Sequence, residues 1–337
     1  MKTSSVAQKI LFVHNVTSAF VTIDLQLLRE RWDVQEWHER GRVTNLPALI
    51  AAVRRCDLVF GWFASWHTFW PITLARLMRK PSVLVIGGYD VANIPDIGYG
   101  HQSGGLKQWV SRWIIHRAKK LITISLYSQQ EIDRNIGSIS QRTQVIYLGF
   151  SDPFESCALF EQERSNTAIT IGHVAHTNLA RKGHEAFVRA AAFLPQTNFV
   201  LIGDWRDDSI DYLRRIAPDN VSFTGWLTRE QINDYLQSAS VYVQASRHEG
   251  FGMAVAEAML AGCIPVVTRA GALPEVVGDT GIYINSDDPK EIAFGVEQAL
   301  KSGRQARQKA RERILIQFPL ERRRQGLHKI VEELLGQ

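Results

Sequence analysis

The segment Ser246–Val267, SRHEGFGMAVAEAMLAGCIPVV, contains the pattern that decides the fold. It follows an apolar strand, Val241–Ala245, and opens with a turn that carries Gly250 and Gly252. A helix of small residues is expected next, and the segment ends on a second apolar strand, Ile264–Val267. This order is typical of a parallel α/β unit. The helix N-terminus then lies at the mouth of the first strand, where free N–H groups and partial positive charge favour an anion such as a diphosphate.

Apolar strand-like runs alternate with helical patterns along the whole chain, which predicts doubly wound parallel sheets. The first series of expected strands is Ile10–Val13, Leu58–Phe60, Val83–Ile86, Leu121–Ile124 and Val145–Tyr147, with helices such as Leu46–Arg55, Phe69–Met78 and Gly105–Ala118 between them. The second series is Ala168–Ile171, Phe199–Ile202, Val221–Phe223, Val241–Val243, Ile264–Val267 and Ile282–Ile284. The expected fold class is therefore α/β, with two Rossmann-like domains that face a cleft.

The length of the chain fits this division. Its 337 residues exceed one ordinary hydrophobic core and suit two domains of roughly 150 residues each. The polar stretch 151–165 has no strand period and is interpreted as the linker. We expect one domain over 1–150, a second over 165–318, and a helix within 319–337 that packs back on the first domain.

Composition excludes several classes of protein. With 45% hydrophobic and 22% charged residues, the chain is neither disordered nor fibrous. The three cysteines, Cys56, Cys157 and Cys263, are far apart and form no CxxC pair, which disfavours a disulfide framework and a zinc site. We find no signal-peptide pattern and no run of about 18 apolar residues. A cytoplasmic protein is the expectation.

Charge is unevenly distributed along the chain. Residues 1–150 hold 18 Lys and Arg against 10 Asp and Glu, whereas residues 151–337 hold 21 against 24. The basic half is also rich in aromatic residues, and this combination fits peripheral contact with the anionic inner face of a membrane. The alternative is that the aromatic residues are core packing and the charges are solvated. No nucleic acid partner is expected. The aromatic residues are Trp62, Phe63, Trp66, Phe69, Trp70, Trp109 and Trp113.

Glu249 and Glu257 are two carboxylates eight positions apart in the opening segment. If both were helical they would lie about 80° apart around the axis, so Glu249 has to lie in the preceding loop for both to reach one ligand. An acidic residue that binds ribose hydroxyls is typical of dinucleotide sites, and Glu257 fits that role, with Glu249 beside a sugar. Taken singly, either residue is better explained as a glutamate favoured by the helix dipole or as one that faces solvent.

These residues resemble a known family. Glu-x7-Glu, within Glu249-Gly-Phe-Gly-Met and Glu257-Ala-Met-Leu-Ala-Gly, is similar to the signature of the family 4 retaining glycosyltransferases, which have the GT-B fold. The resemblance covers about residues 168–300. It implies transfer of a sugar from a nucleotide-diphosphate sugar with retention of configuration and without a required metal. Glu249 would contact the donor sugar, Glu257 would hold the ribose, and the amides of Gly250, Phe251, Gly252 and Met253 would hold sugar or phosphate.

A basic pair forms the second family-like element. Arg181-Lys182-Gly183 follows the expected strand and loop that contain Gly172 and His173. In the family, an arginine after the strand glycine and a lysine before the later glycine neutralise the diphosphate. Lys182 matches the lysine. His173 occupies the arginine position, which is a departure, so Arg181 would stand in for it or the helix N-terminus would share the phosphates.

Two further loops match the family pattern. Leu201-Ile-Gly203-Asp204 resembles its strand-end element of glycine and acid. Phe223-Thr-Gly-Trp226-Leu227 resembles its glycine-containing loop, whose backbone borders the nucleotide base. Ordinary strand-to-loop turns are the alternative for both.

The N-terminal half should bind the acceptor, and its residues match the family less well. The loop His14–Ser18 lacks the expected glycine, and no histidine follows the later strand that ends at Ile86. The loop beyond that strand is rich in Gly, Tyr and Asp, which suits a binding loop at strand ends. Our acceptor-side candidates are Asp90, Tyr89 and His101.

The predicted activity is transfer of a hexose from a UDP- or GDP-sugar to a glycan, lipid-linked or small-molecule acceptor, with no cofactor beyond the donor. Lys182, Arg181 and the helix amides would stabilise the departing diphosphate, and attack would occur from the front face. A catalytically inactive binding or scaffold protein with the same fold is the main alternative. An epimerase or phosphorylase of this fold is another. An NAD-dependent oxidoreductase is disfavoured because no GxGxxG follows the first strand.

Overall fold

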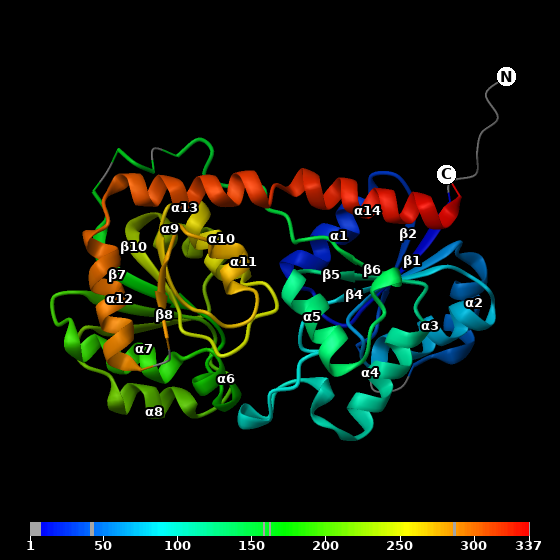
Figure 1. The fold of residues 1–337 in the computed structure, drawn as a ribbon, viewed down its shortest axis with the longest axis horizontal. Helices are drawn as coiled ribbons and strands as arrows, with labels where there is room; N and C mark the ends of the chain where they lie inside the picture. The colour runs from blue at the N-terminus through cyan, green and yellow to red at the C-terminus, as the bar shows by residue number, and fades with distance from the viewer. Residues whose placement is uncertain (1–7, 41–43, 158, 162, 286–287, 337) are drawn as a thin grey trace. The chain divides into compact units, whose positions relative to one another are not determined.

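The computed structural model describes residues 8–40, 44–157, 159–161, 163–285 and 288–336. The chain forms two compact units. The N-terminal unit runs to Gly149 and also takes in the segment that starts at Leu320, and the C-terminal unit is Phe150–Pro319. Figure 1 shows the helices and strands of both units with their labels.

The N-terminal unit contains a six-stranded parallel sheet with the order β2-β1-β3-β4-β5-β6. Because β1 is followed by β2 on one side and β3 on the other, the strand order reverses between β1 and β3. The strands are β1 Lys9–His14, β2 Asp33–His38, β3 Leu58–Trp62, β4 Ser82–Ile86, β5 Lys120–Thr123 and β6 Thr143–Val145. The α-helices are α1 Ala19–Arg29, α2 Leu46–Arg55, α3 Trp66–Leu77, α4 Gly105–Arg117, α5 Leu126–Asn135 and α14 Leu320–Leu335, with short 3-10 turns at Pro95–Ile97, His101–Ser103 and Ser140–Arg142.

The C-terminal unit contains a second parallel sheet with the order β12-β11-β10-β7-β8-β9. Its order reverses between β7 and β10. The strands are β7 Ser165–Ile171, β8 Asn198–Ile202, β9 Val221–Gly225, β10 Ala239–Gln244, β11 Ile264–Thr268 and β12 Ile282–Ile284. The α-helices are α6 His176–Arg181, α7 His184–Ala190, α8 Ser209–Ile216, α9 Arg229–Ser238, α10 Met253–Leu260, α11 Leu273–Val277, α12 Pro289–Lys301 and α13 Arg304–Gln317, with a 3-10 turn at Ala191–Phe193.

The expected parallel α/β architecture is confirmed in both units, and three details differ from the sequence expectation. The strand expected at Val145–Tyr147 is β6, which ends at Val145. Strand β2 was not predicted, because DVQEWH is largely polar and lies at the sheet edge, where only β1 pairs with it. The expected linker 151–165 is tied to the C-terminal unit, since Arg311 bonds to Asp152 and the Phe150 N–H donates to the Phe318 carbonyl at 2.9 Å.

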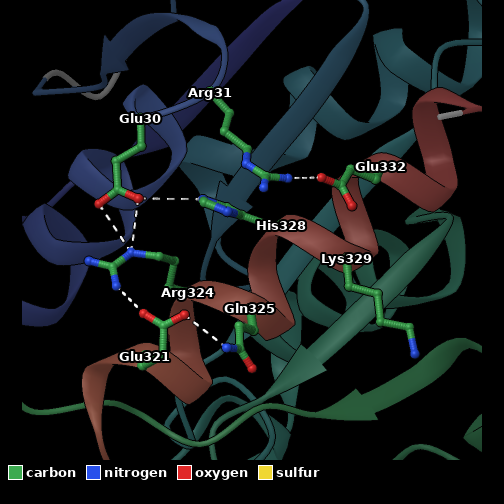
Figure 2. A pocket seen from close by; sticks show the side chains of 8 residues that line it. All are labelled: Glu30, Arg31, Glu321, Arg324, Gln325, His328, Lys329 and Glu332. Atoms are coloured by element: carbon green, nitrogen blue, oxygen red, sulfur yellow. Dashed lines mark hydrogen bonds and ion pairs between the residues drawn. The ribbon is translucent and has the colours of Figure 1, made fainter.

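The last helix, α14, completes the core of the N-terminal unit. Arg323 and Asp24 are both 1% exposed, and the Arg323 guanidinium donates to the Asp24 carboxylate at 2.6 and 2.9 Å. The indole of Trp62 donates to the same carboxylate at 3.0 Å. Figure 2 shows a pocket beside α14, where Arg324 pairs with Glu30 and Arg31 pairs with Glu332. The acidic and basic side chains that line the pocket neutralise one another. We therefore interpret the pocket as part of the packing of α14 on the N-terminal unit.

None of the described helices combines the length and the apolar character that crossing a membrane requires.

Candidate functional site

The loops after β7 and β10 meet where the strand order of the C-terminal sheet reverses. Open α/β sheets bind ligands at this point, outside the carboxyl ends of the strands. Two contacts hold these loops together. The Arg247 N–H donates to the Arg181 carbonyl at 2.8 Å, and Gly183 packs on Ala245. Gly183 has a φ of +70° and a Cβ there would lie 2.3 Å from the Ala245 carbonyl oxygen, so only glycine fits.

Glu249 is the centre of this site. It lies in the loop after β10, as expected, and is 9% exposed. Its carboxylate accepts hydrogen bonds from the Lys182 ammonium, from the Ser246 hydroxyl at 2.9 Å and from the Gln244 amide at 3.0 Å. Burial alone would raise the pKa of Glu249, but the charges of Lys182 and Arg181 outweigh burial and hold this pKa below its usual value. The carboxylate is therefore ionised, and it positions the lysine.

Arg181 lies beside this pair. Its guanidinium donates to the Asn178 side-chain oxygen at 2.6 and 3.1 Å, and its charge is among the causes that lower the pKa of Glu249. The structure thus brings both sequence-predicted cations to the carboxylate, although Lys182 and Glu249 are 67 positions apart. Two cations facing one carboxylate leave net positive charge at the strand ends, which favours an anionic ligand.

Glu257 lies on α10 and carries a partner that the sequence did not indicate. Its carboxylate accepts from Arg229, the first residue of α9, at 2.8 Å. Burial raises the pKa of Glu257, and the charge of Arg229 and its hydrogen bond act against the rise. The Glu257 side chain remains 23% exposed, so part of it is accessible.

The turn between Glu249 and α10 presents backbone rather than side chains. Gly252 has a φ of +102° and caps α10, which begins at Met253. Gly250 is partly exposed, whereas the side chain of Phe251 is 2% exposed and packs against Phe150 and Phe318 with ring centroids 5.9 and 5.4 Å away. A contact between Phe251 and a ligand is therefore restricted to its backbone.

The glycines after β7 and β8 bring two loops into contact. A Cβ on Gly203 would lie 2.1 Å from the Gly172 carbonyl oxygen, so these backbones touch. His173, at the position of the family arginine, is exposed, and its ring bonds to Asp204. Asp204 also pairs with Arg206. Asp204, the acid expected at the strand end, therefore binds the side chains of His173 and Arg206.

The loop after β9 exposes its tryptophan. Trp226 is 71% exposed and Leu227 is partly buried. Thr228 follows, and its side chain caps α9 by accepting from the Gln231 N–H at 3.3 Å. This cap fixes the start of the helix whose first residue, Arg229, reaches Glu257.

In the N-terminal unit, the acceptor-side candidates form hydrogen bonds or ring contacts with other residues of the unit. Asp90 is 1% exposed and accepts from the backbone N–H groups of Ala64, Gly87 and Gly88 at 2.9–3.4 Å. Burial raises the pKa of Asp90 to about 6, against the effect of these bonds. His101 is also buried, and its ring bonds to the Ala64 carbonyl at 3.2 Å. Tyr89 is the exposed member, and its ring packs against that of His101.

Several residues of the site escaped the sequence analysis. Gln244 and Ser246, which donate to Glu249, are polar residues at the end of an apolar strand, and that interruption was the available signal. Gly271 packs against the Glu249 backbone, where a Cβ would lie 2.1 Å from its carbonyl oxygen. The neighbouring Ala272 N–H donates to the same carbonyl at 2.9 Å.

Among the described residues, two groups of side chains have ligand atoms close enough for a metal ion. His14, Glu36 and His38 lie at the ends of β1 and β2, and His176, Asp207 and Asp208 lie on the surface of the C-terminal unit. Neither group includes Glu249 or Lys182.

Comparisons with known proteins extend this description. The family model described as glycosyl transferases group 1 matches residues 166–302. An uncharacterized glycosyltransferase of Methanocaldococcus jannaschii is 28% identical over 198 residues, which cover 54% of this chain and 50% of the relative. An O-antigen chain mannosyltransferase B of Escherichia coli is 27% identical over 202 residues, covering 55% of this chain and 52% of the relative. The chain spans about half the length of these curated relatives.

Solved structures match over nearly the whole chain. HepE of Anabaena, in complex with UDP and glucose, has a TM-score of 0.74 and 18% identity, and covers 96% of this chain and 99% of its own. Sucrose-phosphate synthase of Thermosynechococcus elongatus has a TM-score of 0.76 and 19% identity, and covers 98% and 99%. At this identity the likeness shows the fold. The chain therefore has the GT-B fold, and its residues 166–302 are similar to the group 1 glycosyl transferases.

Proposed function

We propose that the protein is a retaining glycosyltransferase of the family 4 type that transfers a hexose from a nucleotide-diphosphate sugar, with a UDP- or GDP-sugar as donor, to a glycan or lipid-linked acceptor. The C-terminal unit binds the donor and the N-terminal unit binds the acceptor. The observation that carries the proposal is the Lys182–Glu249 pair at the reversal point of the C-terminal sheet, directly before the N-terminus of α10.

Each group at the site has a role in this reaction. The bond between the anomeric carbon and the phosphate oxygen breaks, and negative charge builds on the diphosphate. Lys182, Arg181 and the amides at the start of α10 offer positive potential that is fixed beforehand, which is the most effective form of such stabilisation. In the proposed reaction, Glu249 orients Lys182 and accepts a hydrogen bond from a donor hydroxyl. Glu257 accepts hydrogen bonds from the ribose.

The acceptor is proposed to attack from the face that the diphosphate leaves. Its oxygen forms the new bond to the anomeric carbon, and its proton passes to the departing phosphate. Front-face attack requires no protein nucleophile. It is compatible with an acceptor side whose candidate carboxylate, Asp90, is already occupied by backbone N–H groups.

Thermal-shift measurements with UDP, GDP, ADP, CMP and NAD, each without and with EDTA, test the donor site. A ligand that binds only the native state raises the apparent melting temperature. We expect one nucleotide diphosphate to stabilise the protein in an EDTA-insensitive way and to lose this effect in Glu257→Ala. Glu297→Ala, which removes a partly exposed glutamate on α12, is the matched control. Stabilisation by NAD alone would contradict the proposal.

A catalytically inactive donor-binding protein is the second candidate. The observation that favours it is His173, which stands where the family has an arginine and is tied to Asp204. Incubation with the donor that the thermal shift identifies separates the two functions. Transfer, or slow donor hydrolysis without acceptor, indicates the enzyme, whereas binding without turnover indicates the inactive protein. Analysis of the product's anomeric configuration tests retention and distinguishes a transferase from an epimerase or phosphorylase.

A further inference from the structure

The outer faces of α3 and α4 in the N-terminal unit expose large apolar side chains. Trp66 and Trp70 on α3 are 51% and 39% exposed, and Leu106 and Trp109 on α4 are 63% and 50% exposed. Spacings of four and three positions place each pair on one side of its helix. Exposed apolar side chains that gather in this way mark interaction sites more often than chance positions.

The two helices form one continuous surface. Contacts between α3 and α4 are extensive, and the helices are neighbours in Figure 1. The ring of Phe69 on α3 lies 6.0 Å from the rings of both Trp109 and Trp113 on α4. The Trp113 indole donates to the Thr73 hydroxyl at 3.2 Å. The aromatic residues are thus held in a layer that joins the helices, with its outer members in solvent.

Several basic side chains lie on and next to the two helices. The ranges of α3 and α4 contain no Asp or Glu. Within the part of the chain that the structure describes, none of the cations on and next to these helices forms an ion pair. These cations are Arg76, Arg79, Lys80, Lys107, Arg112, Arg117, Lys119 and Arg142.

The crowding of like charges is visible in two pKa values. Burial first, and then the charges of Arg142, Arg112 and Arg117, lower the pKa of His116. Burial and the charge of Arg76 lower the pKa of Arg117, whose guanidinium lies over the Trp113 ring at 3.1 Å. A partner with negative charge would relieve this repulsion.

We propose that the α3–α4 surface, defined by Trp66, Trp70, Leu106, Trp109 and the cations around them, binds an anionic lipid bilayer. Tryptophan favours the level of the lipid headgroups, where its ring is apolar and its N–H is hydrated. Each basic side chain near an anionic leaflet adds attraction. The exposed aromatic residues lie in the first halves of the helices, and Arg76, Arg117 and the cations after them lie at the other end. The aromatic end enters the headgroup layer while the basic end contacts its charges.

This position has a consequence for the acceptor, which rests on the proposed function. In a parallel α/β unit, the N-termini of the helices lie at the carboxyl edge of the sheet. The loop that carries Tyr89 and His101 leads from β4 directly into α4. The aromatic end of the surface is therefore on the same edge as the acceptor-side loop, and a lipid-linked acceptor would be presented to that loop from the bilayer.

Flotation with lipid vesicles tests the surface independently of catalysis. We expect the purified protein to float with vesicles of phosphatidylcholine and phosphatidylglycerol and to bind vesicles of phosphatidylcholine alone far more weakly. Trp66→Ser/Trp109→Ser should lower the partition coefficient roughly tenfold or more, because two inserted side chains are removed. Arg76→Gln/Arg79→Gln/Lys107→Gln should lower it about a hundredfold at low salt.

Matched controls remove equivalent groups from the C-terminal unit. Phe193→Ser/Phe294→Ser removes two exposed rings, and Lys290→Gln/Lys301→Gln/Lys309→Gln removes three exposed cations. Both should bind vesicles as the wild type does, and unchanged melting temperatures would show that all variants fold. Equal losses in control and test variants would overturn the proposal. So would binding of the wild type to soluble heparin but not to anionic vesicles, because that result would indicate an acidic macromolecule instead of a bilayer.

Discussion

The carboxyl edges of the two sheets use polar side chains in different ways. In the C-terminal unit, Glu249 binds another side chain, Lys182, and both remain partly accessible. In the N-terminal unit, the carboxylate of Asp90 is saturated by backbone N–H groups of its own loops. A charged residue at a strand end is thus available for chemistry when its partner is an accessible charged side chain. It is structural when its partners are fixed backbone.

The largest effect is expected where the N-terminal unit buries an ion pair. Arg323→Ala leaves the carboxylate of Asp24 buried without its cation, which should lower the free energy of unfolding by about 3–5 kcal/mol. Urea denaturation measures this change. Arg324→Ala, whose partners Glu30 and Glu321 are exposed, is the control and should cost less than about 1 kcal/mol. Similar small losses in both variants would contradict a structural role for the buried pair.

The corresponding change in the C-terminal unit should affect catalysis instead. Lys182→Ala removes a cation that is fixed for the leaving diphosphate, so sugar transfer should fall roughly 100- to 1000-fold while the protein still folds. Initial rates with the identified donor measure this, and circular dichroism checks the fold. Arg189→Ala removes an exposed cation of the same unit and should leave the rate unchanged. Wild-type turnover in Lys182→Ala would refute the proposed donor site.

Much of the fold was predictable because the inner strands of both sheets are largely buried. Runs such as β3 and, after Ser82, β4 contain only apolar residues and glycine, and burial on both faces requires this. The polar β2 was missed because an edge strand carries no such run. Its placement depends on pairing with β1, which the local sequence does not encode.

Residues of the candidate site could be proposed from the sequence where they lie close together along the chain in a recognisable pattern. Glu249, Glu257 and Lys182 belong to patterns within single loops and helices. The role of Asp90 was not predictable, because it depends on the Gly87–Asp90 turn folding back on Ala64, 26 residues earlier. Arg229 was missed for the same reason, since its contact with Glu257 spans 28 residues.

The two units also differ in the hydrogen bonding of a buried histidine. His67 in the N-terminal unit bonds to the Trp62 carbonyl, whereas neither ring nitrogen of His184 has a hydrogen-bond partner in the described structure. Burial lowers the pKa of His184 from 6.5 to about 3, with the charges of Lys182 and Arg181 adding to the effect. The unfolded chain therefore takes up this proton near pH 6.5 while the native ring stays neutral, so acidification favours unfolding.

The free energy of unfolding should fall by about 3 kcal/mol between about pH 6.5 and about pH 4 because of His184. His184→Leu should remove this contribution to the pH dependence of stability. Denaturation at several pH values measures the slope of the free energy of unfolding. His176→Leu, at an exposed position, is the control for the loss of a histidine side chain. If His184→Leu keeps the wild-type slope, the ring is protonated in the native protein and has a partner that the structure does not show.

The smallest effect is expected at the pair of Arg229 and Glu257. The Arg229 side chain is 50% exposed, and ion pairs of this kind contribute less than about 1 kcal/mol, so Arg229→Ala should weaken binding of the nucleotide diphosphate by roughly fivefold at most. Glu257→Ala removes charge-assisted hydrogen bonds to the ribose and should weaken binding by roughly ten- to a hundredfold. Titration calorimetry measures both. Equal losses would mean that Arg229 itself contacts the donor, because a residue that only orients Glu257 leaves the carboxylate in place to bind the ribose.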